Sequence, residues 1–145
     1  MKLVLQRVAN AAVYIEGQTV AKISQGLLIF FGVEKKDNSD KVNYLADKAL
    51  TLRIFQDDKG KMNFSCLDVS GEVLVISQFT LAGDCTKGKR PSFDNAAQPK
   101  EANLLYRQFI EKVSESGLTV KEGEFGANMQ VELVNDGPVT FFLSR

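Results

Sequence analysis

The 145-residue sequence contains no histidine and no tryptophan, and it has only two cysteines and three prolines. Without histidine the chain cannot form a Ser-His-Asp or Cys-His catalytic arrangement, a His-ligated zinc site, or the usual general base that titrates near neutral pH. The two cysteines, Cys66 and Cys85, are too few for a thiolate metal site, and their spacing matches no redox motif. We therefore expect neither a metal nor a cofactor.

Long apolar runs and an excess of one charge are absent as well. The longest apolar run, Leu27–Val33, is far shorter than the roughly 20 residues that a membrane-spanning helix needs. The 18 basic side chains balance 18 acidic ones, which argues against tight non-specific binding to nucleic acid but permits a local basic patch. With no signal-like N-terminus, we expect a cytoplasmic protein with reduced thiols and no membrane attachment.

The composition that remains is typical of one globular domain. Hydrophobic residues make up 44% of the chain and charged residues 25%, which excludes disorder and low complexity. The length matches the common domain size of roughly 100–150 residues, and we see no repeat or linker. We expect a single domain that spans residues 1–145.

Hydrophobic periodicity predicts a β-rich fold with two helices. Dense apolar runs at 27–33 and 72–76 predict central strands, because both of their faces are apolar. Helical spacing occurs at 42–49, where Asn38 or Ser39 can cap the helix, and again from Pro99 to residue 113. Further strands are expected at 3–8, 11–15, 19–23, 119–122, 129–134 and 139–143, with a hairpin around the turn at 57–61. The predicted fold is α+β, with mostly antiparallel sheets in a barrel-like or two-sheet arrangement.

Two polar segments follow or connect predicted strands. Ser77-Gln78-Phe79-Thr80 places hydroxyls, an amide and unpaired backbone N–H groups at the end of a buried strand, although hydroxyls there commonly bond only nearby backbone. Asn135-Asp136-Gly137-Pro138-Val139-Thr140 lies between two predicted strands, and Gly followed by Pro favours an ordinary hairpin turn. Its X-Pro bond is of the kind that has an accessible cis state.

The third segment lies in the non-periodic stretch 82–98. Lys87, Lys89 and Arg90 can contact phosphates and Phe93 can stack on a base, although a basic loop is often simply solvated. By contrast, residues 123–126 lack the strand-and-helix context of a glycine-rich nucleotide site.

Together these segments resemble the D-aminoacyl-tRNA deacylases. Residues 77–81 and 135–140 are similar to the two signature motifs of that family, and the opening Leu5-Gln6-Arg7-Val8 and the loop 87–93 are similar to it as well. The resemblance implies hydrolysis of the ester that joins a D-amino acid, or glycine, to the 3′-terminal adenosine of tRNA. It also implies a homodimer in which the Gly137-Pro138 motif of one subunit reaches into the active site of the other.

The resemblance assigns a role to each segment. Ser77, Gln78, Phe79 and Thr80 form the catalytic segment, in which backbone N–H groups near Phe79 and Thr80 stabilise the oxyanion. Lys87, Lys89 and Arg90 contact the tRNA. An activated ester needs less help than an amide, so we favour attack by water assisted by the ribose 2′-hydroxyl. The alternative, Thr80 as nucleophile, lacks an adjacent base to activate the hydroxyl.

For chiral selection we expect a cis Gly137–Pro138 bond whose backbone blocks an L side chain and lets glycine through. Arg7 is expected to fasten this motif by bonding a carbonyl near it. Two other functions stay open at this point. They are a non-catalytic module that binds RNA ends, and a hydrolase that acts on free D-amino-acid esters.

Overall fold

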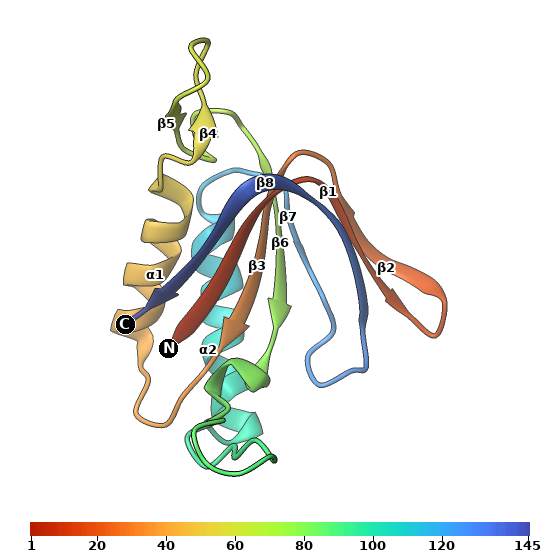
Figure 1. Ribbon diagram of the computed structural model, residues 1–145, viewed down its shortest axis with the longest axis vertical. Coiled ribbons are helices and arrows are strands. Elements are labelled where there is room, and N and C mark those ends of the chain that lie inside the picture. Colours follow the sequence, from red (N-terminus) through yellow and green to blue (C-terminus); the bar gives the residue numbers. More distant parts are fainter.

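One strongly curved sheet of six strands dominates the structure, a computed structural model that describes residues 1–145 (Figure 1). Five strands follow the order β2-β1-β3-β6-β7, and β8 lies along the other side of β1. Their bounds are β1 (Lys2–Ile15), β2 (Gln18–Ile23), β3 (Gly26–Gly32), β6 (Glu72–Ser77), β7 (Val120–Glu122) and β8 (Gln130–Ser144). A second, small sheet consists of β4 (Phe55–Gln56) and β5 (Met62–Phe64), on either side of the predicted turn.

The predicted class, α+β with a mostly antiparallel, barrel-like sheet and two helices, is confirmed. β1 pairs antiparallel with β2, β3 and β8, whereas the pairs β3–β6 and β6–β7 are parallel. The strands expected at 3–8 and 11–15 are one continuous strand, β1, and those expected at 129–134 and 139–143 are one strand, β8.

The predicted hairpin turn at 135–140 is wrong. Both halves of β8 pair with the same neighbour, β1, so the chain does not reverse direction there. The Gly-Pro segment instead interrupts the ladder, and the register between the two strands shifts on each side of Val8. A local departure from regular pairing of this kind resembles a β-bulge, which keeps the strand direction while re-aiming the residues around it.

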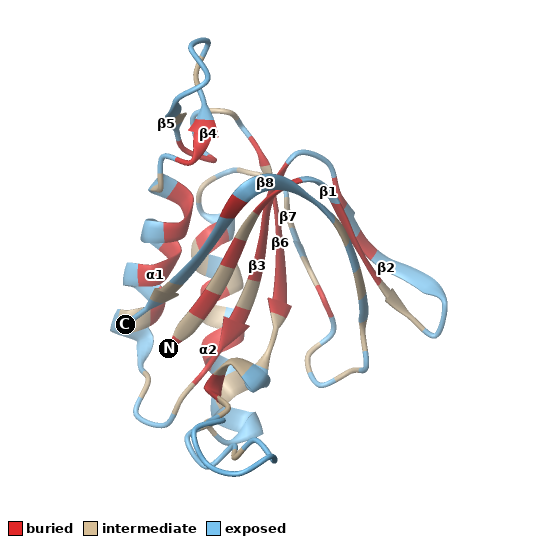
Figure 2. Ribbon diagram, viewed as in Figure 1, coloured by how far each residue is buried: buried red, intermediate tan, exposed pale blue.

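Two helices cover one face of the sheet. α1 (Ser39–Thr51) begins after Asn38, whose side chain accepts a hydrogen bond from the Lys41 N–H at 3.2 Å, as predicted for a cap. α2 (Pro99–Ser114) begins at Pro99 and packs beside α1. Its Tyr106 and Phe109 bury their rings against Phe31 of β3. A smaller apolar cluster lies on the opposite face of the sheet, where β2 contacts β6, and Figure 2 shows buried stretches on both of these strands. Neither helix is long and apolar enough to cross a membrane.

The two thiols have opposite environments. Cys66 is fully buried in the larger apolar cluster, and this burial raises the pKa of its thiol to about 12. Cys85 is exposed in the loop between β6 and α2. Both cysteines are free thiols, as expected.

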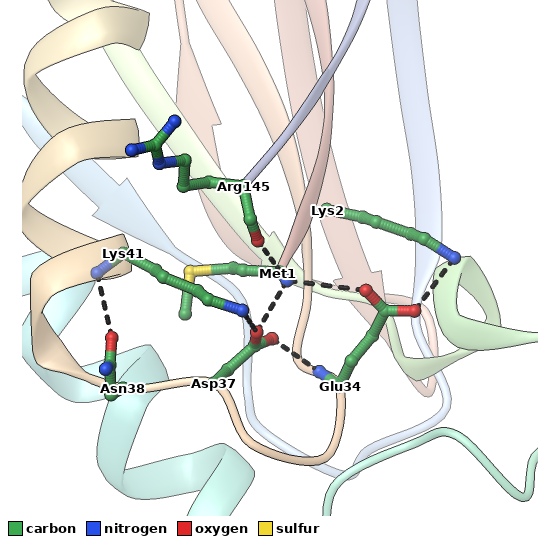
Figure 3. A network of polar contacts seen from close by, with 7 residues as sticks. All are labelled: Met1, Lys2, Glu34, Asp37, Asn38, Lys41 and Arg145. Carbon is green, nitrogen blue, oxygen red and sulfur yellow. Dashed lines mark hydrogen bonds and ion pairs between the residues drawn. The ribbon is translucent and has the colours of Figure 1, made fainter.

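The two chain ends meet in a polar network (Figure 3). The Met1 ammonium group lies 2.7 Å from Asp37 Oδ1 and 3.4 Å from Glu34 Oε2, and it donates to the Arg145 carbonyl at 3.0 Å. Lys41 Nζ and the Glu34 N–H also donate to the Asp37 carboxylate, at 2.8 and 2.7 Å. Burial on its own would raise the pKa of Asp37, but these donors outweigh it and lower that pKa below the usual value.

Candidate active site

The segment Ser77–Thr80 lies at the carboxyl end of β6, as predicted. Ser77 is the last residue of the strand and pairs with Phe31. The Gln78 N–H donates to the Phe31 carbonyl at 2.8 Å, and the chain then turns into a short 3-10 helix, η1 (Phe79–Ala82). Four residues that the sequence singles out are thus held on the end of a central strand.

Gly32 permits this turn to lie across the end of β3. A Cβ atom at position 32 would lie 2.8 Å from the Cβ of Leu81 and 3.0 Å from the Gln78 carbonyl oxygen. Both distances are shorter than ordinary van der Waals contacts, so any side chain here would push η1 away from the sheet. The missing side chain at Gly32 therefore fixes where Phe79 and Thr80 sit.

The turn after β6 presents backbone N–H donors together with the Gln78 amide and the Thr80 hydroxyl. The first hydrogen bond of η1 runs from the Leu81 N–H to the Gln78 carbonyl at 3.2 Å, so the N–H groups of Phe79 and Thr80 have no acceptor within the helix. Gln78 Nε2 donates to the Thr80 hydroxyl oxygen at 2.5 Å. The Thr80 oxygen is therefore occupied as an acceptor, while its proton remains available to a substrate.

A cavity of about 440 Å³ opens beside the segment. That volume is within the range of small-molecule sites, which is roughly 300–1,000 Å³. Its walls come from the ends of β3 and β6, the start of α2, and the loop between β7 and β8. The lining residues include Phe31, Val33, Ile76, Ser77, Gln78, Phe79, Ala97, Pro99, Tyr106, Phe125, Asn128, Met129 and Val131.

The cavity wall contains no side chain that is charged at neutral pH. Its one titratable group is the Tyr106 hydroxyl, which donates to the Val75 carbonyl at 2.9 Å. Burial, followed by the negative charge of Glu122, raises the pKa of Tyr106 well above its usual value. No group of three or more potential metal ligands occurs in the chain. The protomer therefore offers hydrogen-bond donors and apolar surface here, but no acid–base pair.

The far wall of this cavity was missed by the sequence interpretation. Residues 123–126 lack the context of a nucleotide-binding site, yet Phe125 and the following loop to Met129 line the cavity. This loop lies beside Ser77 because β6 and β7 are parallel, so that their carboxyl ends meet at one edge of the sheet. A prediction of that parallel pair would have brought the two segments together.

The basic loop lies at the same end of the molecule as Ser77–Thr80. Lys87, Lys89 and Arg90 are exposed, and none of them forms an ion pair. The loop contacts the segment Ser77–Thr80 through Phe93, whose ring lies 4.9 Å from that of Phe79, edge to face. The structure thus brings together two of the three segments that the sequence singles out.

The third segment, around Gly137–Pro138, lies elsewhere. It pairs with β1 near Arg7. Through the neighbouring strand β3, Arg7 lies at the same level of the sheet as Val73 of β6, which comes four residues before Ser77. At about 3.3 Å per residue, this places the motif about 13 Å along the strands from Ser77, and it is also three strands across the sheet. Gly137 and Pro138 are exposed, and their peptide bond is cis, as predicted.

Arg7 fastens this motif in a different way from the one predicted. Its buried guanidinium pairs through Nε with Asp136 Oδ2 at 2.7 Å, and its Nη1 donates to the Ile54 carbonyl rather than to a carbonyl of the motif. The carbonyl contacts near the motif are made by Asn135, whose amide donates to the carbonyls of Arg7 and Val139 at 2.9 and 3.1 Å. No local sequence signal indicates that Asn135 and Asp136 make these contacts.

Comparison with known proteins gives consistent matches over the whole chain. A family model described as D-Tyr-tRNA(Tyr) deacylase matches residues 4–144. The D-aminoacyl-tRNA deacylase of Thermosipho africanus is 55% identical, covering 99% of this chain and 96% of that protein, and the one of Clostridioides difficile is 52% identical with the same coverage.

Two solved structures are similar to this chain over almost its whole length. A structure described as c-Myc DNA Unwinding Element Binding Protein superposes with a TM-score of 0.94 at 37% identity, covering 100% of this chain and 99% of that one. A probable eukaryotic D-amino acid tRNA deacylase has a TM-score of 0.83 at 16% identity, covering 98% and 97%, and so shares the fold.

Proposed function

Because the chain belongs to the D-Tyr-tRNA(Tyr) deacylase family, we propose that the cavity at the end of β6 is where the ester of a D-aminoacyl-tRNA is hydrolysed. The protein is a hydrolase of the D-aminoacyl-tRNA deacylase type. In this proposal all of residues 1–145 act as one deacylase domain, and the reaction releases free tRNA and the D-amino acid.

The composition of the cavity wall is the observation that carries the mechanism. With no carboxylate, amine or imidazole on the wall, the protomer supplies no general base to activate a nucleophile. An aminoacyl ester is already activated, so positioning and oxyanion stabilisation suffice. Water adds to the ester carbonyl, its proton passes by way of the ribose 2′-hydroxyl, and the bond to the 3′-oxygen breaks as that oxygen takes up the proton.

The backbone turn after β6 supplies the stabilising donors. The N–H groups of Phe79 and Thr80, which have no acceptor within η1, are directed to the tetrahedral oxyanion. A single oxyanion donor is typically worth about 2.7–4 kcal/mol of transition-state stabilisation. Ser77 and Gln78 hold the terminal ribose, and Thr80, with its oxygen already engaged by Gln78, positions the substrate through its proton.

Chiral selection, in this proposal, requires a second copy of the chain. Gly137–Pro138 is too far from Ser77 to act within one protomer, so it serves the active site of a partner. The strand β8 supports an interface, because it lies at an edge of the sheet and pairs with β1 alone, and because Val134, Phe141 and Phe142 are large apolar residues that remain exposed along it. A twofold homodimer, the commonest arrangement of soluble oligomers, places one such motif in each site.

The backbone of that motif would act as a rigid obstacle. D- and L-aminoacyl esters carry the same groups, so discrimination needs an element that excludes the L side chain. Main-chain atoms suit this purpose because they have no rotamers with which to yield. Glycine has no side chain to exclude, so glycyl-tRNA is expected to be a substrate too.

The tRNA is held mainly at its single-stranded end. Lys87, Lys89 and Arg90 contact the phosphates of that end, which reconciles RNA binding with a net charge of zero. We place the protein in the cytoplasm, where its substrate occurs, and assign it no cofactor and no membrane partner.

One experiment tests this function directly. Purified protein is incubated with D-Tyr-tRNA, L-Tyr-tRNA, Gly-tRNA and, in parallel, a free D-tyrosine ester, and the loss of each ester is followed over time. We expect the D-tyrosyl and glycyl esters to be lost and the L-tyrosyl ester to survive. Binding of tRNA without turnover would indicate a non-catalytic module instead, and equal hydrolysis of free D-tyrosine esters would indicate a small-molecule hydrolase.

Sedimentation equilibrium tests the assembly. We expect a species of about twice the 16.0 kDa of one chain at micromolar concentration. A monomer at that concentration would contradict the shared active site, because a single chain leaves the two motifs apart.

A further inference from the structure

Phe79 is one of the residues that line the cavity, yet most of its side chain is exposed to solvent. Its ring is 60% exposed, which makes it the most exposed aromatic side chain of the protein. A large apolar side chain that stays in water contributes little to folding, so its position at the mouth of the cavity calls for another explanation.

The ring is held in place by its neighbours. Phe93 packs edge to face against it, with the ring planes at 61°. Phe93 in turn lies over Gly83, where its ring would be 3.1 Å from a Cβ atom, and the Phe93 carbonyl accepts from the Ala96 N–H at 2.9 Å. Phe79 is therefore a supported aromatic surface that presents its free side to solvent.

The loop that ends at Phe93 carries the charge that suits a nucleotide. Asp84 and Ser92 close it with two backbone hydrogen bonds of 2.7 and 2.9 Å. Between them the loop contains three exposed cations and no acidic residue. A supported aromatic ring beside a short basic loop is the combination by which proteins bind single-stranded nucleic acid, with bases on the ring and phosphates on the cations.

We propose that the exposed side of Phe79 stacks on the base of the nucleotide that precedes the terminal adenosine, while the loop 85–91 binds the adjoining phosphates. This inference rests on the proposed function, because it requires the terminal adenosine to enter the cavity beside Ser77. It adds a binding subsite outside that cavity and gives the Phe79 side chain a role separate from that of its backbone.

The test compares substrates of increasing length. The D-tyrosyl esters of adenosine, of cytidylyl-adenosine, and of cytidylyl-adenosine without the cytosine base are assayed for kcat/KM. In the wild-type protein we expect the added cytidine to raise kcat/KM by about tenfold, within the range measured for stacking of one base. The substrate without the cytosine base should lose most of that gain.

The decisive variant is Phe79→Leu, which removes the ring and keeps the backbone. The ratio of kcat/KM between the dinucleotide and adenosine esters should fall to below about twofold. Because the readout is a ratio, it is independent of any general loss of activity. Tyr44→Leu, which removes an exposed aromatic ring on α1, is the matched control and should keep the wild-type ratio.

The remaining outcomes are distinguishable. An unchanged ratio in Phe79→Leu would refute this inference alone, and so would a wild-type protein that gains nothing from the added cytidine. A change of the Phe79→Leu protein to a different sedimenting mass would refute it as well, since the ring would then be a subunit contact. Failure to hydrolyse any of the esters would refute both the proposed function and this subsite.

Discussion

Replacing Thr80 by valine separates the two mechanisms that the sequence leaves open. The hydroxyl makes one hydrogen bond, in which it accepts from Gln78 at 2.5 Å, and the cavity beside it holds no base. If Thr80 only positions the substrate, the loss is that of about one hydrogen bond, about 1 kcal/mol, which corresponds to about a fivefold fall in rate. Removing a covalent nucleophile from a hydrolase costs about a millionfold.

Single-turnover loss of D-Tyr-tRNA measures this difference, which spans about five orders of magnitude. When samples of the wild-type reaction are quenched with acid and the protein is analysed by mass spectrometry, no tyrosyl adduct should be present. Thr19→Val, at an exposed position of strand β2, controls for the general effect of the substitution. A fall of more than about ten-thousandfold in a folded Thr80→Val protein, or an ester trapped on Thr80, would refute the positioning role. A substrate whose terminal ribose lacks the 2′-hydroxyl should lose more activity than this variant does.

Three further substitutions test the description of the site and the fold. Gly137→Ala should leave urea unfolding unchanged, because the new Cβ would meet only Asn135 Oδ1 at 3.8 Å. The same variant should lower the turnover of D-esters. Unchanged turnover together with unchanged D/L selectivity would contradict the proposed role of the motif. Gly32→Ala should reduce activity on all esters, because the Cβ would collide with Leu81 and displace η1; normal activity would show that the turn tolerates movement. Asp37→Asn should lower the free energy of unfolding by about 3 kcal/mol at pH 7, because it removes one partner from a buried ion network. The pKa of Asp37 is lowered in the folded state, so this stabilisation is complete above the unfolded pKa of about 3.9 and is lost as the pH falls through the folded pKa. The difference in unfolding free energy between wild type and Asp37→Asn should therefore shrink in acid, and a difference that does not shrink would contradict the network.

The elements that the sequence predicts well are those with a local physical signal. The dense apolar run of β3 and the 3.6-residue spacing of α1 and α2 depend on residues close together in the chain, and the Asn38 cap and Pro99 start lie where local preferences place them. Local preferences predict a hairpin turn at the Gly-Pro segment, and this prediction is wrong. Gly and Pro do favour turns, but both halves of β8 pair with β1, and this long-range pairing keeps the chain running in one direction.

The candidate site shows the same division. Residues 77–80 stand out in the sequence because they follow a recognisable strand, and residues 135–140 because Gly-Pro lies between two predicted strands. The resemblance to the deacylase family rests on both segments. The wall formed by Phe125 and Tyr106 carries no local signature, since what places it there is the parallel pairing of β6 with β7 and the packing of α2. Arg7 was singled out correctly as a residue near the Gly-Pro segment, but its contact with Asp136 depends on which atoms the folded backbone brings within reach.

The contrast between the two thiols makes the protein ready for site-specific labelling without mutagenesis. Cys66 is fully buried, and its raised pKa of about 12 leaves it almost wholly protonated, so a maleimide reagent will not modify it in the folded state. Cys85 is exposed, two residues before Lys87 in the basic loop. A single environment-sensitive fluorophore attached there would report on that loop as an RNA end arrives.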